Sequence, residues 1–127
     1  MIQKLFIPFV IVDVFIPVFY TFFSFGGEGE IHNAIRQGDL SRVKEFLLKR
    51  PDLIDAKNDN GWTPLHLSSL RGHKDVVHLL IKNGAEVNIK NNKGQTPLDN
   101  ATRIGHQEIM ELLIDKGAKS NSQNLQL

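Results

Sequence analysis

The segment Gly61-Trp62-Thr63-Pro64-Leu65-His66-Leu67-Ser68 carries the clearest structural signal in this 127-residue chain. Thr63 is a typical helix N-cap, because its hydroxyl accepts a hydrogen bond from an N–H of the first helical turn. Pro64 follows at the first helical position, where the missing N–H of proline does no harm. The segment therefore predicts the start of a helix. Gly72 predicts its end, because glycine readily adopts the left-handed backbone that follows many helices.

The same signals recur 33 residues later along the chain. Thr63-Pro64-Leu65 returns as Thr96-Pro97-Leu98, and Gly72-His73 returns as Gly105-His106. Aligned without a gap, residues 60–92 and 93–125 are identical at 13 of 33 positions. A constant period of roughly 20–50 residues indicates stacked repeats, in which each unit buries its apolar face against its neighbours.

Each unit is predicted to contain a second, longer helix. In the middle unit it runs from about Lys74 to Asn83, and its apolar residues share one face (Val76, Leu79 and Leu80). Asn58 to Gly61 and Asn91 to Gly94 are turn sequences between units. A weaker unit precedes them. Its Gly38 lies 34 residues before Gly72, which predicts one extra residue near Arg50-Pro51-Asp52.

These motifs resemble the ankyrin repeat, whose Gly-x-Thr-Pro-Leu-His-x-Ala signature is followed by Gly-His, an apolar helix and Gly-Ala. The third unit departs from the signature at Asp99 and Asn100, where the family prefers histidine and an apolar residue. The resemblance covers about residues 30–120 and implies an all-α solenoid of three helix-turn-helix units. The expected divisions are repeat 1 (degenerate) at 28–59, repeat 2 at 60–92, repeat 3 at 93–120 and a polar tail at 121–127. We expect the polar stretch from Ser120 to Leu127 to be frayed.

Residues 1–27 form a hydrophobic N-terminal segment with a different composition. Of the 19 residues from Leu5 to Phe23, 15 are apolar, which approaches the length of a membrane-spanning helix. Asp13 disfavours that assignment, since a charge near a bilayer centre costs about 2.5–3.5 kcal/mol. Three interpretations stay open: a membrane anchor, a cleaved signal peptide, or neither. The first two predict a membrane-associated or exported protein, in which the repeats would serve as a structural or protective accessory domain. The third predicts a cytoplasmic one.

The sequence holds no constellation that indicates an enzyme, a cofactor or a metal. It has no cysteine, and its five histidines show none of the spacings typical of zinc sites. By the family resemblance, His32 and His66 are structural residues that hydrogen-bond between neighbouring repeats. Lys and Arg total 15 and Asp and Glu total 14, so the net charge of +1 does not favour a nucleic-acid partner.

The resemblance implies a protein partner, which binds at the turn tips and the exposed side of the first helices. In repeats 2 and 3 these positions are Lys57, Asp59, Asn60, Trp62, Leu70, Arg71, Lys90, Asn92, Lys93, Gln95, Arg103 and Ile104, and repeat 1 adds Arg36 and Gln37. The basic members favour an acidic partner for an otherwise monomeric chain. Trp62, the only tryptophan, is either a binding hot spot or a residue that packs against its neighbouring turn.

Overall fold

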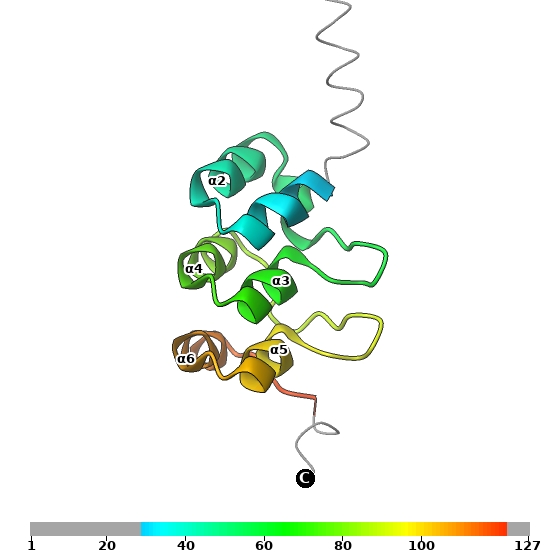
Figure 1. The fold of residues 1–127 in the computed structure, drawn as a ribbon, viewed down its shortest axis with the longest axis vertical. Coiled ribbons are helices and arrows are strands. Elements are labelled where there is room, and N and C mark those ends of the chain that lie inside the picture. The colour runs from blue at the N-terminus through cyan, green and yellow to red at the C-terminus, as the bar shows by residue number, and fades with distance from the viewer. Residues whose placement is uncertain (1–28, 122–127) are drawn as a thin grey trace, which may run out of the picture.

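The computed structural model describes residues 29–121, and that part of the chain forms three helix pairs stacked along one axis (Figure 1). In repeats 2 and 3 the inner helix is shorter than the outer helix, as expected. The inner helices are residues 29–37, α3 (Pro64–Arg71) and α5 (Pro97–Ile104). The outer helices are α2 (Leu40–Lys49), α4 (Lys74–Lys82) and α6 (Gln107–Asp115). The described part contains no strand, which confirms the all-α prediction.

The predicted helix starts and ends are found at the repeated motifs. Thr63 and Thr96 cap α3 and α5, each accepting a hydrogen bond from the N–H three residues later. Gly72 and Gly105 end the same helices in the left-handed conformation, with φ of 77° and 87°. The threonine caps and the glycine caps both provide hydrogen bonds for backbone groups that would otherwise lack a partner at the helix ends.

One continuous apolar core joins the three repeats. Leu65 of α3 and Leu98 of α5 occupy matching positions in the inner layer and are buried. In the outer layer, Leu80 of α4 and Leu113 of α6 are fully buried, whereas Leu79 is only partly buried. Since neighbouring helices contact one another in both layers, each repeat completes the core of the next.

The extra residue of repeat 1 falls in the region where the sequence placed it. Helix α2 has ten residues, one more than α4 or α6. Pro51 then begins a 3-10 helix, Pro51–Asp55, whose Leu53 is buried in the apolar core. Proline lacks an N–H and cannot continue α2, so the chain tightens into a short turn of different geometry. The repeat motifs did not predict this turn.

Histidine rings connect successive repeats. The Nε2 atom of His32 lies 2.9 Å from the carbonyl oxygen of Trp62, and that of His66 lies 2.8 Å from the carbonyl oxygen of Gln95. In His66, Nδ1 accepts the N–H of Thr63, so we assign the proton to Nε2, which donates to Gln95. Burial lowers the pKa of His66 and favours this neutral ring. The predicted structural role of these two histidines is confirmed.

His73 and His106 make a second set of connections that the sequence analysis did not foresee. Their Nε2 atoms lie 3.1 Å from the carbonyl oxygens of Arg36 and Leu70, in the preceding repeats. Each ring also covers a glycine of the preceding repeat. A Cβ built on Gly72 would lie 2.6 Å from Cε1 of His106. This close approach requires glycine at the end of α3, in addition to the positive φ.

Replacing Gly72 with alanine should therefore destabilise the fold more than the same change at Gly105. Both positions have a positive φ, and alanine there costs about 1–2 kcal/mol. A Cβ at Gly105 meets nothing within 4 Å, whereas one at Gly72 displaces the His106 ring and its hydrogen bond. We expect Gly72→Ala to cost about 1 kcal/mol more than Gly105→Ala in urea denaturation. Equal losses would show that the ring contact does not join the repeats.

Asp99 organises the C-terminal end of the described chain. Its carboxylate accepts hydrogen bonds from the N–H of Thr96 (2.9 Å), the hydroxyl of Ser120 (2.9 Å) and the N–H of Asn121 (3.1 Å). The expectation that fraying begins at Ser120 is therefore wrong for Ser120 and Asn121. The physical reason is the change from histidine to aspartate, since a carboxylate accepts donors from the returning chain.

The predictions for residues 1–27 and for most of the tail, 122–127, lie outside the described residues. Within 29–121, no helix combines the length and apolar character that crossing a membrane requires.

Candidate binding groove

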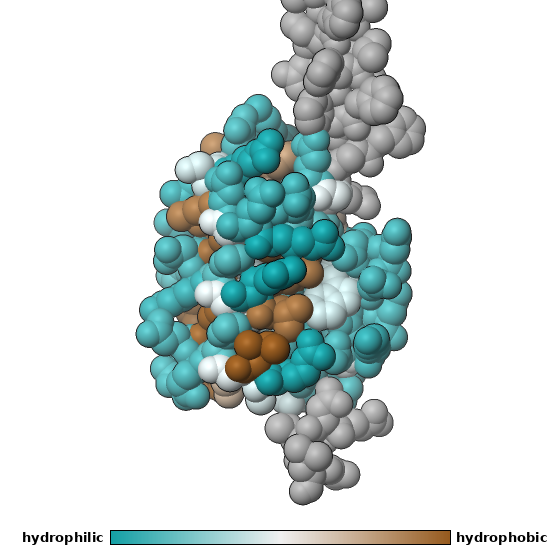
Figure 2. Space-filling model, viewed as in Figure 1, coloured by the Kyte–Doolittle hydropathy of each residue, from teal (hydrophilic) through white to brown (hydrophobic). Residues whose placement is uncertain are grey.

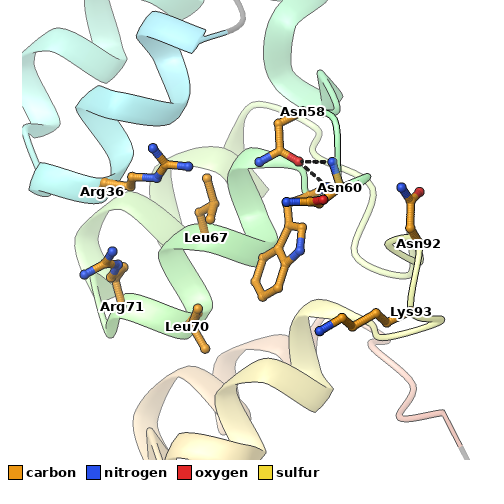
Figure 3. Close-up of a pocket in the computed structure, with 9 residues that line it drawn as sticks. Arg36, Asn58, Asn60, Leu67, Leu70, Arg71, Asn92 and Lys93 are labelled. Carbon is orange, nitrogen blue, oxygen red and sulfur yellow. Dashed lines mark hydrogen bonds between the residues drawn. The ribbon is translucent and has the colours of Figure 1, made fainter.

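A groove lies between the inner helices and the turn loops, which project from one side of the stack (Figures 1 and 3). Its volume is about 530 Å³. The lining residues come from the first inner helix, from α3 and from two successive turns. They are Arg36, Asn58, Asn60, Trp62, Leu67, Leu70, Arg71, Asn92 and Lys93.

The middle of the groove is apolar. Leu67 is 6% exposed, and Leu70 and Trp62 are half-buried. Figure 2 shows hydrophobic surface over α3 and α5, bordered by hydrophilic surface. Helical spacing explains the pair Leu67 and Leu70, because residues three apart lie on the same face of a helix.

Trp62 is held in place by contacts on several sides. Its backbone N–H donates to Oδ1 of Asn58 (3.0 Å), and its backbone carbonyl oxygen accepts from Nε2 of His32 (2.9 Å). Its ring meets the ring of His66 edge to face, with centroids 5.8 Å apart. Trp62 thus packs against its own repeat and also lines the groove, so the two interpretations of this residue do not exclude each other. Its role in binding stays a prediction.

Cations stand on both sides of the apolar middle. Figure 3 shows Arg36 and Arg71 on one side of Leu67 and Leu70, and Lys93 on the other. All three cations are exposed, and none takes part in an ion pair within residues 29–121. No acidic residue is among those that line the groove. The groove therefore presents positive charge that the described part of the chain does not neutralise.

Hydrogen bonds fix the turn loops that form one side of the groove. Oδ1 of Asn58 accepts from the N–H groups of Asn60 and Trp62, and the next turn repeats this pattern from Asn91. Asn92 ties the two turns together, since its N–H donates to the carbonyl of Asn60 at 3.1 Å. A groove with a fixed side loses less conformational entropy when a partner binds.

The structure brings together half of the residues that the sequence analysis selected. Asn60, Trp62, Leu70, Arg71, Asn92 and Lys93 line the groove, as does Arg36 of repeat 1. The others lie outside the lining: Gln37, Lys57, Asp59, Lys90, Gln95, Arg103 and Ile104.

Some of the residues outside the lining have other contacts. Lys57 donates to the carbonyl of Lys90 at 3.5 Å, and the side chain of Gln95 accepts from Asn91. Arg103 and Ile104 are exposed at the end of α5.

Sequence reasoning missed two groove residues, Leu67 and Asn58. Leu67 stands between the histidine and alanine positions of the repeat signature, and an apolar residue there could not be distinguished from core. Asn58 was assigned only to a turn, although the same side chain supports Trp62. The period of 33 gave no signal for Leu67 either, because its equivalent in the next repeat, Asn100, is polar and nevertheless buried.

Asn100 is fully buried, and neither polar atom of its side chain has a hydrogen-bond partner within residues 29–121. An unsatisfied buried polar group costs about 1–3 kcal/mol. Where repeat 2 has the apolar Leu67, repeat 3 therefore carries a buried amide whose polar atoms have no partner in the described part of the chain.

The chain belongs to the ankyrin-repeat family. A family model described as ankyrin repeats (3 copies) matches residues 31–124, which agrees with the period, the caps and the stacked helix pairs. Ankyrin repeats are generally protein-interaction modules, which confirms the class of protein that the repeat motifs indicated.

Relatives match the chain over part of its length. A stretch of 55 residues is 40% identical to the human Ankyrin repeat and SAM domain-containing protein 3, and covers 43% of this chain and 8% of that protein. A stretch of 60 residues is 40% identical to the human Notch-regulated ankyrin repeat-containing protein, and covers 46% of this chain and 52% of that protein. A stretch of 58 residues is 36% identical to the mouse 2-5A-dependent ribonuclease, and covers 46% of this chain and 8% of that protein. The matches thus span less than two thirds of each relative.

Proposed function

We propose that the chain is a non-enzymatic protein-binding module that holds an acidic protein partner in the groove. The observation that carries this proposal is an apolar middle, Leu67 and Leu70, between exposed cations without ion-pair partners in the described chain. Apolar surface supplies most of the free energy of association, and unpaired cations favour partners of opposite charge.

A protein partner suits the groove better than a nucleic acid does. Nucleic-acid surfaces of this size combine many cations with aromatic side chains on which successive bases stack. The groove has one aromatic side chain among its lining residues, Trp62, and its other apolar residues are the aliphatic Leu67 and Leu70. The net charge of +1 also gives little general attraction for a polyanion.

Changing Leu70 to glutamate should strongly weaken partner binding in the groove. The test captures partners on the immobilised full chain, identifies one by mass spectrometry, and measures its affinity for purified variants by calorimetry. We expect Leu70→Glu to weaken binding by about tenfold or more, because it places a charge in the apolar middle and repels an acidic partner. Ile114→Glu is the matched control, since Ile114 is a 56% exposed apolar residue on α6, outside the groove lining. Equal affinities for the two variants would contradict the proposal.

We also propose that the N-terminal segment associates with membranes or directs export, with the repeats as an accessory domain there. The support is the apolar run from Leu5 to Phe23. We expect the full chain in the membrane fraction of expressing cells, and a chain that starts at Glu28 in the soluble fraction. A product that begins near Gly27 would indicate cleavage. Full-length protein that stays soluble would contradict both forms of the proposal.

A further inference from the structure

We infer that the groove recognises an extended peptide segment in which one bulky apolar side chain stands between acidic residues on both sides. This inference rests on the proposed function and specifies the partner's chemistry. It follows from three features of the groove: its apolar middle, the placement of its cations, and a free amide on its rim.

The apolar middle suits a single inserted side chain. Leu67 is almost fully covered at 6% exposure, while Leu70 and Trp62 are half-buried beside it. Asn58 and His32 fix the backbone of Trp62, and its ring packs edge to face against that of His66, so less ordering is needed when a partner binds. A rigid aromatic surface beside aliphatic side chains is typical of pockets that receive an apolar anchor.

The cations favour carboxylates on both sides of that anchor. Arg36 and Arg71 come from the ends of two neighbouring inner helices, and Lys93 comes from the turn on the opposite side (Figure 3). A partner charged on one side only would leave the other cations without a counter-charge. Arginine also pairs with a carboxylate through two parallel hydrogen bonds, which gives direction as well as affinity.

A free amide on the rim favours an extended backbone. The backbone of Asn60 is occupied, since its N–H donates to Asn58 and its carbonyl accepts from Asn92. Its exposed side chain has no hydrogen-bond partner within residues 29–121. A side-chain amide offers one donor group and one acceptor, which match the C=O and N–H of an extended peptide.

The test begins with selection of short random peptides displayed on phage against the immobilised full chain. Enriched peptides are then synthesised and titrated while tryptophan emission is recorded, since Trp62 is the only tryptophan in the chain. We expect enriched peptides with one large apolar residue between acidic residues, and a change in Trp62 emission on binding. Replacing the apolar residue of the peptide by alanine, or its acidic residues by amides, should each weaken binding by about tenfold.

Matched charge variants locate the acidic contacts. We expect the double variant Arg36→Gln/Arg71→Gln to weaken peptide binding by about tenfold at low salt, and less at high salt. The control, Arg42→Gln/Lys44→Gln, removes the same charge from exposed positions on α2 and should change affinity by less than about twofold.

The outcomes separate this inference from the proposed function. Neutral enriched peptides, or binding unaffected by Arg36→Gln/Arg71→Gln, would overturn the inference. The proposed function would stand in that case if Leu70→Glu still weakened partner binding by about tenfold or more. Failure to enrich any peptide would overturn the inference, because an isolated segment would then not suffice. Titration with oligo-deoxythymidine is the last arm, and binding of that probe in place of peptides would overturn both.

Discussion

Truncation of Leu80 to alanine is expected to lower the free energy of unfolding by about 2–5 kcal/mol. Leu80 has no exposed surface, and it belongs to α4, which contacts both α2 and α6 in the outer layer. The lost methyl groups leave a cavity that a close-packed core cannot fill. Native proteins typically have a free energy of unfolding of only about 5–15 kcal/mol. This one change therefore removes a large share of it.

Urea denaturation followed by circular dichroism measures the effect. Leu79→Ala is the control, because Leu79 is the neighbouring residue and is only partly buried. Its loss should be clearly smaller than that of Leu80→Ala. A loss below about 0.5 kcal/mol for Leu80→Ala would be that of a surface site and would show that the assigned helix register is wrong.

Replacing Trp62 with alanine is expected to weaken partner binding by about 2 kcal/mol or more, which is roughly thirtyfold. The half-buried indole lines the groove beside Leu67 and Leu70, and its ring contacts that of His66 before any partner binds. The same change should also lower stability, because the edge-to-face contact with His66 is lost.

Calorimetry with an identified partner and urea denaturation of the same variant separate the two roles of Trp62. Trp62→Phe keeps an aromatic ring against His66 and should recover most of the stability, but only part of the affinity. Unchanged affinity of Trp62→Ala, together with lost stability, would show that Trp62 only packs internally. Partner binding would then have to use another part of the surface.

Much of the fold could be predicted because the signals that specify it are local and repeated. Thr63 and Pro64 define a helix start by short-range chemistry, and the period of 33 places the same start at Thr96. The 3-10 helix at Pro51–Asp55 and the role of Asp99 were missed for a common reason. Both depend on a single departure from the repeat, so no second copy existed against which to compare them.

The groove was harder to predict than the fold. Residues at turn tips, such as Asn60 and Lys93, share a surface because the repeats stack in register, and the period was sufficient to find them. Leu67 was missed because an apolar residue in a helix gives the same sequence pattern whether it faces the core or a groove. Ile104 was assigned to the surface correctly, but it lies outside the lining, because groove boundaries depend on three-dimensional curvature and not on spacing.

The contacts between repeats also make the chain modular in length. The His32–Trp62 and His66–Gln95 hydrogen bonds are equivalent, whereas Asp99 closes its own end with Ser120 and Asn121. A duplicate of residues 60–92, inserted between repeats 2 and 3, would therefore join both neighbours through contacts that already exist. Each insertion would add the groove-lining side chains of one further repeat. The length of partner that this scaffold can bind is therefore set by the number of repeats, independently of the contacts that Asp99 makes at the C-terminal end.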